Sequence, residues 1–195
     1  MSKAVKHSLK VTFLGTGTST GVPVVACNCP ICKSGDVRDK RFRTSAMLTI
    51  NERNIVIDCG PDFRIQMLRN NVEEIDAIIF THGHRDHIAG LDDIRAFNYI
   101  LNKDIDIYGS EEVLEAIQTE FPYIFTETRY FGTPQLVTHA IENTPFIVND
   151  IKIIPIEVMH NKLSVFGYRI GDFTYITDAS YIPVEEMVKM KGSKV

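Results

Sequence analysis

Three histidines and an aspartate fall within one short segment, Thr81-His82-Gly83-His84-Arg85-Asp86-His87, directly after the apolar run 77–80. Clustered imidazoles repel one another when charged and are costly to bury, so a purely structural role explains them poorly. Metal binding removes that conflict, because neutral imidazole and ionised carboxylate are common metal ligands. On a loop that leaves a strand, His82 and His84 can face one side while Asp86 and His87 face another. The segment therefore predicts a site for two ions, with a histidine-rich surface loop as the alternative.

Two further residues lie where additional ligands are needed. His160 follows the strand-like run 151–158, and Asp178 follows the strand-like run 173–176. Residues just beyond strand ends can converge at one edge of a sheet sandwich. Taken alone, either residue is as well explained by an ordinary structural role. Together with the 82–87 cluster, they predict a single metal centre assembled from distant parts of the chain.

A second group of candidate ligands is formed by Cys27, Cys29 and Cys32. The pattern Cys-x-Cys-x-x-Cys lets three thiolates face one tetrahedral zinc, which leaves a fourth position to be filled. The beginning of the chain has no export signal, so metal binding is a better explanation than disulfides. The alternative is three reduced thiols without a metal in a surface loop.

Composition indicates an ordinary globular protein. The 195 residues are 44% hydrophobic, and 21 basic residues against 25 acidic ones give a formal net charge of -4. No basic face for nucleic acid is evident, and no apolar run approaches the ~20 residues of a membrane-spanning helix. We therefore expect one domain covering residues 1–195, located in the cytoplasm, with no membrane partner and no nucleic-acid partner. A homodimer is compatible with the sequence.

Periodicity predicts a mixed α and β chain. Helices are expected at 63–68, at 91–100, at 111–120 with Ser110 as its N-cap, and from Pro183 onward. Strands are expected at 10–14, 46–50, 54–58, 77–80, 151–158, 166–170 and 173–176. The strands thus form an early and a late set around central helices.

The order His-x-His-x-Asp-His, then a histidine, then an aspartate, resembles the metallo-β-lactamase superfamily. Further motifs make the chain similar to the PhnP-type phosphodiesterases of phosphonate catabolism, and the likeness extends over nearly its whole length. These motifs are the segments 13–17, 21–23, 27–32, 57–62, 90–93, 160–162, 167–168 and 177–178. The resemblance implies an α+β fold, a four-layer αββα sandwich with a dinuclear metal site.

The resemblance also implies how the ions are held. It places His82, His84 and His160 on one ion, Asp86 and His87 on the other, and Asp178 between them. The implied cofactors are two divalent transition metals, manganese or zinc, and one structural zinc at the cysteines. A metal-bridging hydroxide is the implied nucleophile, with Asp86, His160 and Asp178 as catalytic residues. The implied reaction is hydrolysis of a small, cyclic or nucleotide-like phosphodiester.

The same family places further histidines beyond the bridging aspartate: a fourth ligand for the structural zinc, another ligand for the second ion, and a general acid. Only 17 residues follow Asp178, and none is a histidine. We therefore expect the chain to be C-terminally truncated and to bind its second ion weakly. The alternative is that a partner subunit supplies these ligands.

Three other functions stay open. A tRNase Z-like hydrolase has the same ligand order, and lactam or thioester hydrolysis can use the same metals, because fold does not fix substrate. A non-catalytic cofactor-assembly protein would share the cysteine loop but tends to have an eroded histidine motif, which is complete here.

Asp58 resembles an aspartate that supports the histidine loop from behind the metals, with a simple turn residue as the alternative.

Overall fold

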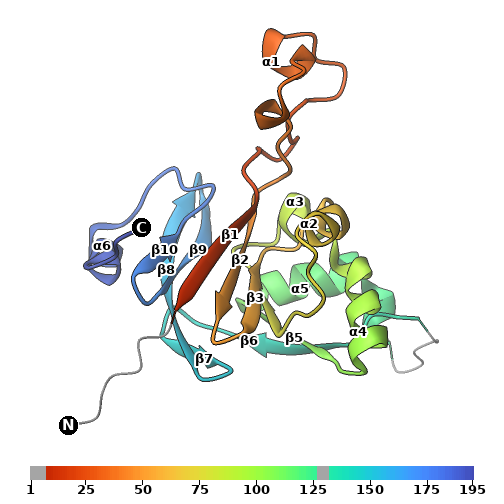
Figure 1. The fold of residues 1–195 in the computed structure, drawn as a ribbon. Helices are drawn as coiled ribbons and strands as arrows, with labels where there is room; N and C mark the ends of the chain where they lie inside the picture. The colour runs from red at the N-terminus through yellow and green to blue at the C-terminus, as the bar shows by residue number, and fades with distance from the viewer. Residues whose placement is uncertain (1–7, 127–131) are drawn as a thin grey trace.

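The protein is described by a computed structural model over residues 8–126 and 132–195. Its strands form two sheets (Figure 1). The first sheet has the order β1-β2-β3-β4-β5-β6, and the second has the order β10-β9-β8-β7. The strands of the first sheet are β1 (Leu9–Gly15), β2 (Ser45–Ile50), β3 (Arg53–Ile57), β4 (Ala77–Ile79), β5 (Ile105–Gly109) and β6 (Leu136–Ala140). Those of the second are β7 (Phe146–Val148), β8 (Ile151–His160), β9 (Leu163–Ile170) and β10 (Phe173–Tyr175).

Pairing direction changes within the first sheet. Strands β1, β2 and β3 are antiparallel neighbours, whereas β3 through β6 run parallel. Parallel neighbours need crossover connections, and these are supplied by helices and 3-10 turns. They are α2 (Phe63–Arg69), α3 (Arg85–Ile88), η2 (Leu91–Ile94), α4 (Arg95–Leu101), α5 (Glu111–Glu120) and η3 (Pro122–Ile124).

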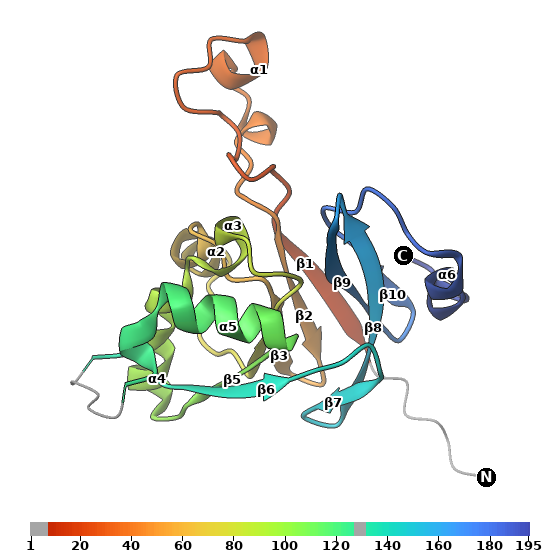
Figure 2. The same cartoon turned by 180° about the vertical axis from the view of Figure 1, so that it is seen from behind.

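Alternation along the strands divides the core into layers. On β3, Ile55 and Ile57 pack between the two sheets, while Val56 faces the helices. Strand β8 likewise turns Ile153 toward the first sheet and Ile156 toward α6 (Val184–Met190). Helices α2, α4 and α5 therefore cover one outer face and α6 the other, as Figures 1 and 2 show from opposite sides. The predicted four-layer αββα sandwich is confirmed.

Several expected elements differ in detail. The helix expected at 91–100 is split into η2 and α4, and strands β5, β6 and β7 lie in stretches to which no strand was assigned. The idea of an early and a late set of strands around central helices is therefore wrong, because β5 and β6 extend the first sheet from the middle of the chain. Strand β8 also runs to His160 itself, so this histidine ends a strand instead of following one.

A projection, which we call the cysteine hook (residues 16–44), connects β1 to β2. Its arms are joined by backbone hydrogen bonds from Val22 N to Arg41 O at 2.9 Å and from Arg41 N to Val22 O at 2.8 Å. Beyond them lie α1 (Pro30–Lys33) and η1 (Val37–Asp39), and Figures 1 and 2 both show this tip standing clear of the sandwich. The three clustered cysteines are therefore held away from the histidine segment.

One buried carboxylate helps to attach helix α6 to the second sheet. Glu186 accepts a hydrogen bond from the backbone N of Glu157 at 2.8 Å and another from the Asn143 amide at 3.0 Å, and it pairs with Lys189 at 2.9 Å. Burial acts to raise the pKa of Glu186, but these partners lower it below the ordinary value. Within the described residues, no helix combines the length and apolar composition needed to cross a membrane.

Candidate metal centre

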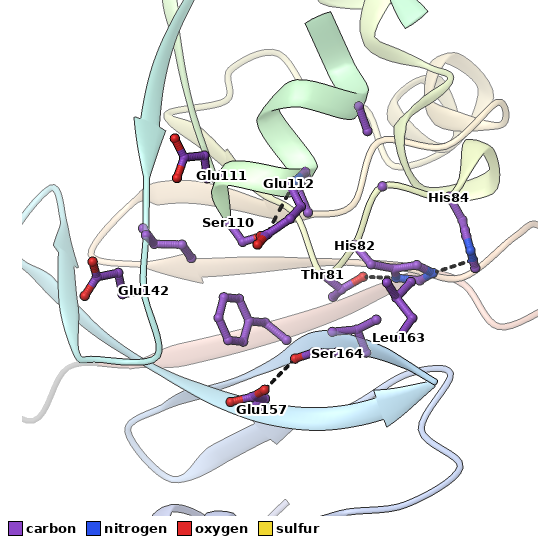
Figure 3. Close-up of a pocket in the computed structure, with 16 residues that line it drawn as sticks. Thr81, His82, His84, Ser110, Glu111, Glu112, Glu142, Glu157, Leu163 and Ser164 are labelled. Carbon is purple, nitrogen blue, oxygen red and sulfur yellow. Dashed lines mark hydrogen bonds between the residues drawn. The ribbon is translucent and has the colours of Figure 1, made fainter. Parts of the chain in front are cut away.

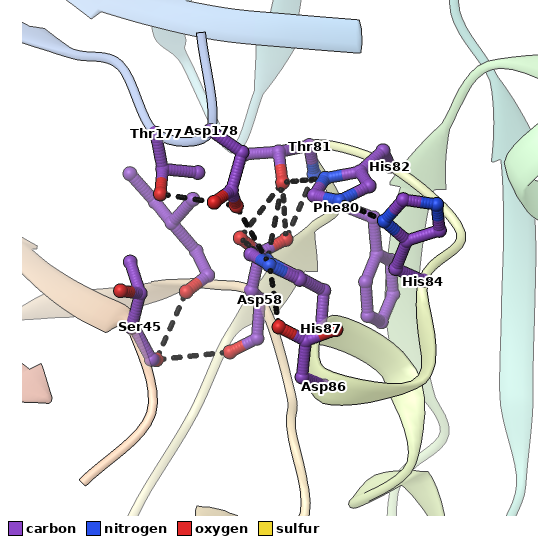
Figure 4. A network of polar contacts seen from close by, with 12 residues as sticks. Ser45, Asp58, Phe80, Thr81, His82, His84, Asp86, His87, Thr177 and Asp178 are labelled. Carbon is purple, nitrogen blue, oxygen red and sulfur yellow. Dashed lines mark hydrogen bonds and ion pairs between the residues drawn. The ribbon is translucent and has the colours of Figure 1, made fainter. Parts of the chain in front are cut away.

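The candidate ligands His82, His84, Asp86, His87 and Asp178 meet at one edge of the sandwich (Figure 4). Ligand atoms of His82, His84 and His160 lie within 4.8 Å of one another, and so do those of His82, His87 and Asp178. The first sheet positions His82, His84 and His87 through the loop after β4 and the short helix α3. The second sheet contributes His160 at the end of β8 and Asp178 after β10. The centre therefore spans both sheets.

Asp58 orients this cluster from beneath. It follows β3 with a φ of 63°, in the left-handed region that aspartate tolerates better than most residues. Its side chain is fully buried and accepts hydrogen bonds from the Thr81 backbone N at 2.8 Å and the Thr81 hydroxyl at 2.8 Å. A carboxylate oxygen also accepts from His87 Nδ1 at 2.8 Å. Because Nδ1 is thus occupied, His87 directs Nε2 outward, toward Asp178 at 2.9 Å.

Two glycines allow the histidine loop to lie against β3. A Cβ on Gly60 would fall 2.0 Å from the Asp86 carbonyl oxygen, and a Cβ on Gly90 would fall 2.1 Å from the Gly60 carbonyl oxygen. This close approach permits backbone hydrogen bonds from Cys59 N to His87 O at 2.7 Å and from Gly90 N to Cys59 O at 2.8 Å. Only residues without a side chain fit at these two positions.

Charge at the centre favours a cation. Burial acts to lower the pKa of His87, but the charge of Asp58 and hydrogen bonds to Asp178, Asp58 and Asp86 raise it to about 12. The hydrogen bond from His87 in turn lowers the pKa of Asp178 to about 2. Burial and the charge of His87 lower the pKa of His82 to about 4, so that this imidazole is neutral.

Positive charge is thus stabilised where carboxylates surround an imidazole, and neutral imidazole is available beside it. Imidazoles and carboxylates within a few ångströms form a donor set that suits divalent transition metals. The residues therefore fit the ions that the sequence predicts. An ion near His87 Nε2 would replace the proton that the carboxylates of Asp178 and Asp86 otherwise stabilise there.

One close group, His82, His84 and His160, is the set implied for one ion, whereas the other close group does not coincide with the implied second set. His82 belongs to both close groups, whereas Asp86 belongs to neither within the described residues, although its carboxylate lies 3.4 Å from His87 Nε2. Asp178 lies with His82 and His87, and His84 groups with His160. The assignment of each residue to an ion, and of Asp86, His160 and Asp178 to catalysis, stays a prediction.

The cysteine hook brings its thiols together as well. The sulfurs of Cys27, Cys29 and Cys32 lie within 4.8 Å of one another. The backbone N of Cys32 donates to Cys29 Sγ at 3.4 Å, and this contact is the main cause that lowers the pKa of Cys29. The backbone N of Val24 donates to Cys32 Sγ at 3.3 Å. Three converging sulfurs fit one tetrahedral ion with a position to spare.

Sequence reasoning missed two sets of residues at the centre. Thr81 bridges Asp58 to the histidines, with its hydroxyl oxygen 3.0 Å from His82 Nδ1, and only its position beside His82 hinted at this. A pocket of about 690 Å³ adjoins His82 and His84 (Figure 3). It is lined in part by acids from separate elements, Glu111, Glu112, Glu142 and Glu157, which form no sequence motif.

Two sheets packed face to face, helices on both outer faces, and a histidine and aspartate cluster at the edge define the metallo-β-lactamase fold class. Comparison with known families agrees. The model of a family described as the β-lactamase superfamily domain matches residues 53–195. The chain belongs to this superfamily.

Individual relatives extend the comparison. The chain is 38% identical over 189 residues to a Porphyromonas gingivalis protein named octanoyltransferase, covering 96% of this chain and 38% of that protein. It is 29% identical over 170 residues to ribonuclease Z of a Nostoc species, covering 84% of this chain and 47% of the relative. The chain thus spans less than half the length of either. The crystal structure of a diphosphatase from the PhnP family matches with a TM-score of 0.87 at 37% identity, covering 95% of this chain and 71% of that one.

Proposed function

We propose that this chain carries the metal centre of a hydrolase that cleaves a small phosphodiester, cyclic diesters included. The observation that carries the proposal is the convergence of His82, His84 and His160 from two different sheets beside an open pocket. A structural zinc site has no need of an adjoining cavity, whereas a catalytic site must admit substrate. Likeness to a PhnP-family diphosphatase supports phosphorus chemistry.

The chain's own residues prepare the site for this reaction. Asp58 and Thr81 hold the imidazoles of His87 and His82 in fixed orientations, so little reorganisation is needed when substrate arrives. Asp178 enters from the second sheet and faces His87. Two divalent ions, manganese or zinc, held by these side chains would supply the positive charge that ionises water and offsets charge developing on phosphorus. A third ion, a zinc at the cysteine hook, would have a structural role.

Ribonuclease Z activity is the second candidate, favoured by the likeness to the Nostoc enzyme. The composition of the pocket argues against it. None of the described residues that line the pocket is a lysine or arginine, whereas binding of an RNA backbone depends on such cations. We therefore favour a small substrate.

Turnover of bis(p-nitrophenyl) phosphate and of 2',3'-cyclic nucleotides, with added manganese or zinc, tests the proposal. We expect the His160→Ala variant to lose activity by about a hundredfold, because it removes a donor contributed by the second sheet. His139→Ala is the matched control, since His139 lies on β6 and pairs with Asp106 away from the centre. Equal turnover by the two variants, or none by the metal-loaded wild type, contradicts the proposed function.

A further inference from the structure

Tyr175 carries a buried hydroxyl group that has no hydrogen-bond partner among the described residues. It is the last residue of β10, and only 6% of its surface is exposed. Its ring packs in the core layer between the two sheets, where a phenylalanine would supply the same apolar contact. A buried donor without an acceptor is destabilising, so packing alone does not explain a tyrosine at this position.

The charged groups around this hydroxyl belong to the metal centre. Burial raises the pKa of Tyr175, and the negative charges of Asp58 and Asp178 raise it further. Both carboxylates are therefore close enough for their charges to act on the hydroxyl. Tyr175 also pairs across the strands with Tyr168, whose own hydroxyl donates to the Phe80 carbonyl oxygen just before the histidine loop. The two tyrosines thus lie side by side beneath the centre.

The two carboxylates differ in what they can still accept. Both oxygens of Asp58 already accept hydrogen bonds, from Thr81 and from His87. Asp178 uses only Oδ2, which lies 2.9 Å from His87 Nε2 and 3.3 Å from the hydroxyl of Thr177 (Figure 4). Its Oδ1 has no donor within the described part of the chain. An ionised carboxylate accepts through both oxygens, so Asp178 has an acceptor to spare.

Other candidate ligands are already held from behind. Side chains that bind a metal are usually fixed in direction by hydrogen bonds from groups around them, and these partners raise affinity for the ion. Asp58 has this role for His87, and the Thr81 hydroxyl lies 3.0 Å from His82 Nδ1. Asp178, by contrast, receives only the exposed hydroxyl of its neighbour on the oxygen that faces His87.

We propose that Tyr175 is a positioning residue of the metal centre, whose hydroxyl donates to Asp178 Oδ1 when the centre holds its ions. The bond forms only with the ions in place, because Oδ2 of Asp178 is turned toward His87 until then. Tyr175 lies three residues before Asp178 on the same segment, so one strand of the second sheet supplies both the ligand and its support. The inference rests on the metal centre of the proposed function but not on its substrate.

The test measures affinity for manganese, which imidazole and carboxylate ligands bind but thiolates do not favour, so that the cysteine hook does not contribute. Tyr175→Phe removes only the hydroxyl, and we expect it to raise the dissociation constant by about tenfold to a hundredfold. The free energy of unfolding of the metal-free variant should stay at the wild-type value. Tyr168→Phe is the matched control: it is equally buried in the same core layer, and it should lose stability but keep the wild-type affinity.

A second measurement follows the hydroxyl directly. The chain has seven tyrosines and no tryptophan, so a near-ultraviolet difference spectrum on adding manganese reports changes around tyrosine hydroxyls. The wild type and Tyr168→Phe should both show such a change, and Tyr175→Phe should lack it.

The outcomes separate this inference from the function. If Tyr175→Phe binds manganese as tightly as Tyr168→Phe, keeps the spectral change, or loses as much stability without metal, the inference is overturned and the proposed function stands. Weaker binding by Tyr175→Phe, together with no phosphodiester turnover by the manganese-loaded wild type, overturns the function and leaves the inference standing. A wild type that binds neither manganese nor zinc at the histidines overturns both.

Discussion

Asp58 shows at the scale of one residue how the metal centre depends on a side chain that no solvent reaches. Its carboxylate fixes Thr81 and His87, and through them the directions in which the imidazoles point. We expect Asp58→Asn to weaken binding of zinc by about tenfold to a hundredfold, because outer partners of metal-binding histidines usually have effects of this size. Competition with a chromogenic chelator measures the change.

The control for this variant is Asp104→Asn, which alters an exposed aspartate in the turn before β5. Its zinc affinity should match that of the wild type. An Asp58→Asn protein that binds zinc as tightly as the Asp104→Asn protein would show that Asp58 is a turn residue without influence on the metal.

Tyr168 and Tyr175 are buried on paired strands, and they differ in whether the side-chain hydroxyl has a hydrogen-bond partner. Tyr168 donates to the carbonyl oxygen of Phe80 at 2.5 Å, whereas the Tyr175 hydroxyl is buried with no partner among the described residues. Tyr168→Phe should lower the free energy of unfolding by about 1–2 kcal/mol, since a buried carbonyl is left unpaired. Tyr175→Phe should change it by less than about 0.5 kcal/mol. Urea denaturation measures both, and equal losses would refute this reasoning.

At this scale, a residue's role could be predicted only where several candidate ligands lie close together in the sequence. His82, His84, Asp86 and His87 lie within six residues, so the sequence alone predicted them as candidate metal ligands. Thr81 and Glu142 are common residue types with no pattern around them. Their roles come from contacts across the sheets, which periodicity cannot reveal.

At the scale of elements, the contact between α3 and the end of β3 controls the centre. A methyl group on Gly60 would collide with the Asp86 carbonyl oxygen, so Gly60→Ala must push α3 and its ligands outward. We expect a loss of stability of about 2 kcal/mol or more and a fall in zinc affinity of at least tenfold. Thermal melting and chelator competition measure the two effects.

Gly35→Ala provides the matched control, because a Cβ at Gly35 in the cysteine hook meets nothing within 4 Å. Its melting temperature and zinc affinity at the histidine centre should stay at wild-type values. Wild-type behaviour of Gly60→Ala would mean that the loop can move without disturbing the ligands.

The attachment of α6 should depend on pH. The pKa of Glu186 is lower in the folded protein than its ordinary value of 4.5, so its contribution is complete above that value and is lost as pH falls through the folded pKa. Glu186→Gln should cost about 1 kcal/mol at pH 7 and little at acidic pH. Hydrogen exchange of residues 184–190 across this range measures the difference. Glu185→Gln, next to it but exposed, should leave the profile unchanged.

Elements were predictable where alternation or capping was strong. The hairpin of β2 and β3 and the Ser110-capped helix α5 agree with the expectations. Strand β5 does alternate buried and half-buried residues, although no strand was expected there. Strand β7 has only three residues and β6 is mostly exposed on an edge, so neither has the continuous apolar pattern of β4. Their pairing is decided by neighbouring strands and not by their own residues.

At the scale of the whole molecule, the centre joins the two sheets, because its candidate ligands come from both. An ion that binds only the folded state raises the free energy of unfolding in proportion to the logarithm of the ion's concentration. Zinc at about one hundred times its dissociation constant should therefore add about 2.7 kcal/mol. Differential scanning calorimetry with and without a chelator measures this gain. His160→Ala should abolish most of it and His139→Ala none, and an equal gain in both variants would contradict a centre shared between sheets.

Because the centre takes its candidate ligands from both sheets, binding of an ion there depends on the two sheets staying packed against each other. Heat or denaturant can move β8 away from the loop after β4. This movement separates His160 from His82 and His84 while each sheet is still intact. Ion release should then precede the loss of β-structure in a melting curve. A metal-sensitive dye would register the opening of the sandwich while circular dichroism still reports two intact sheets.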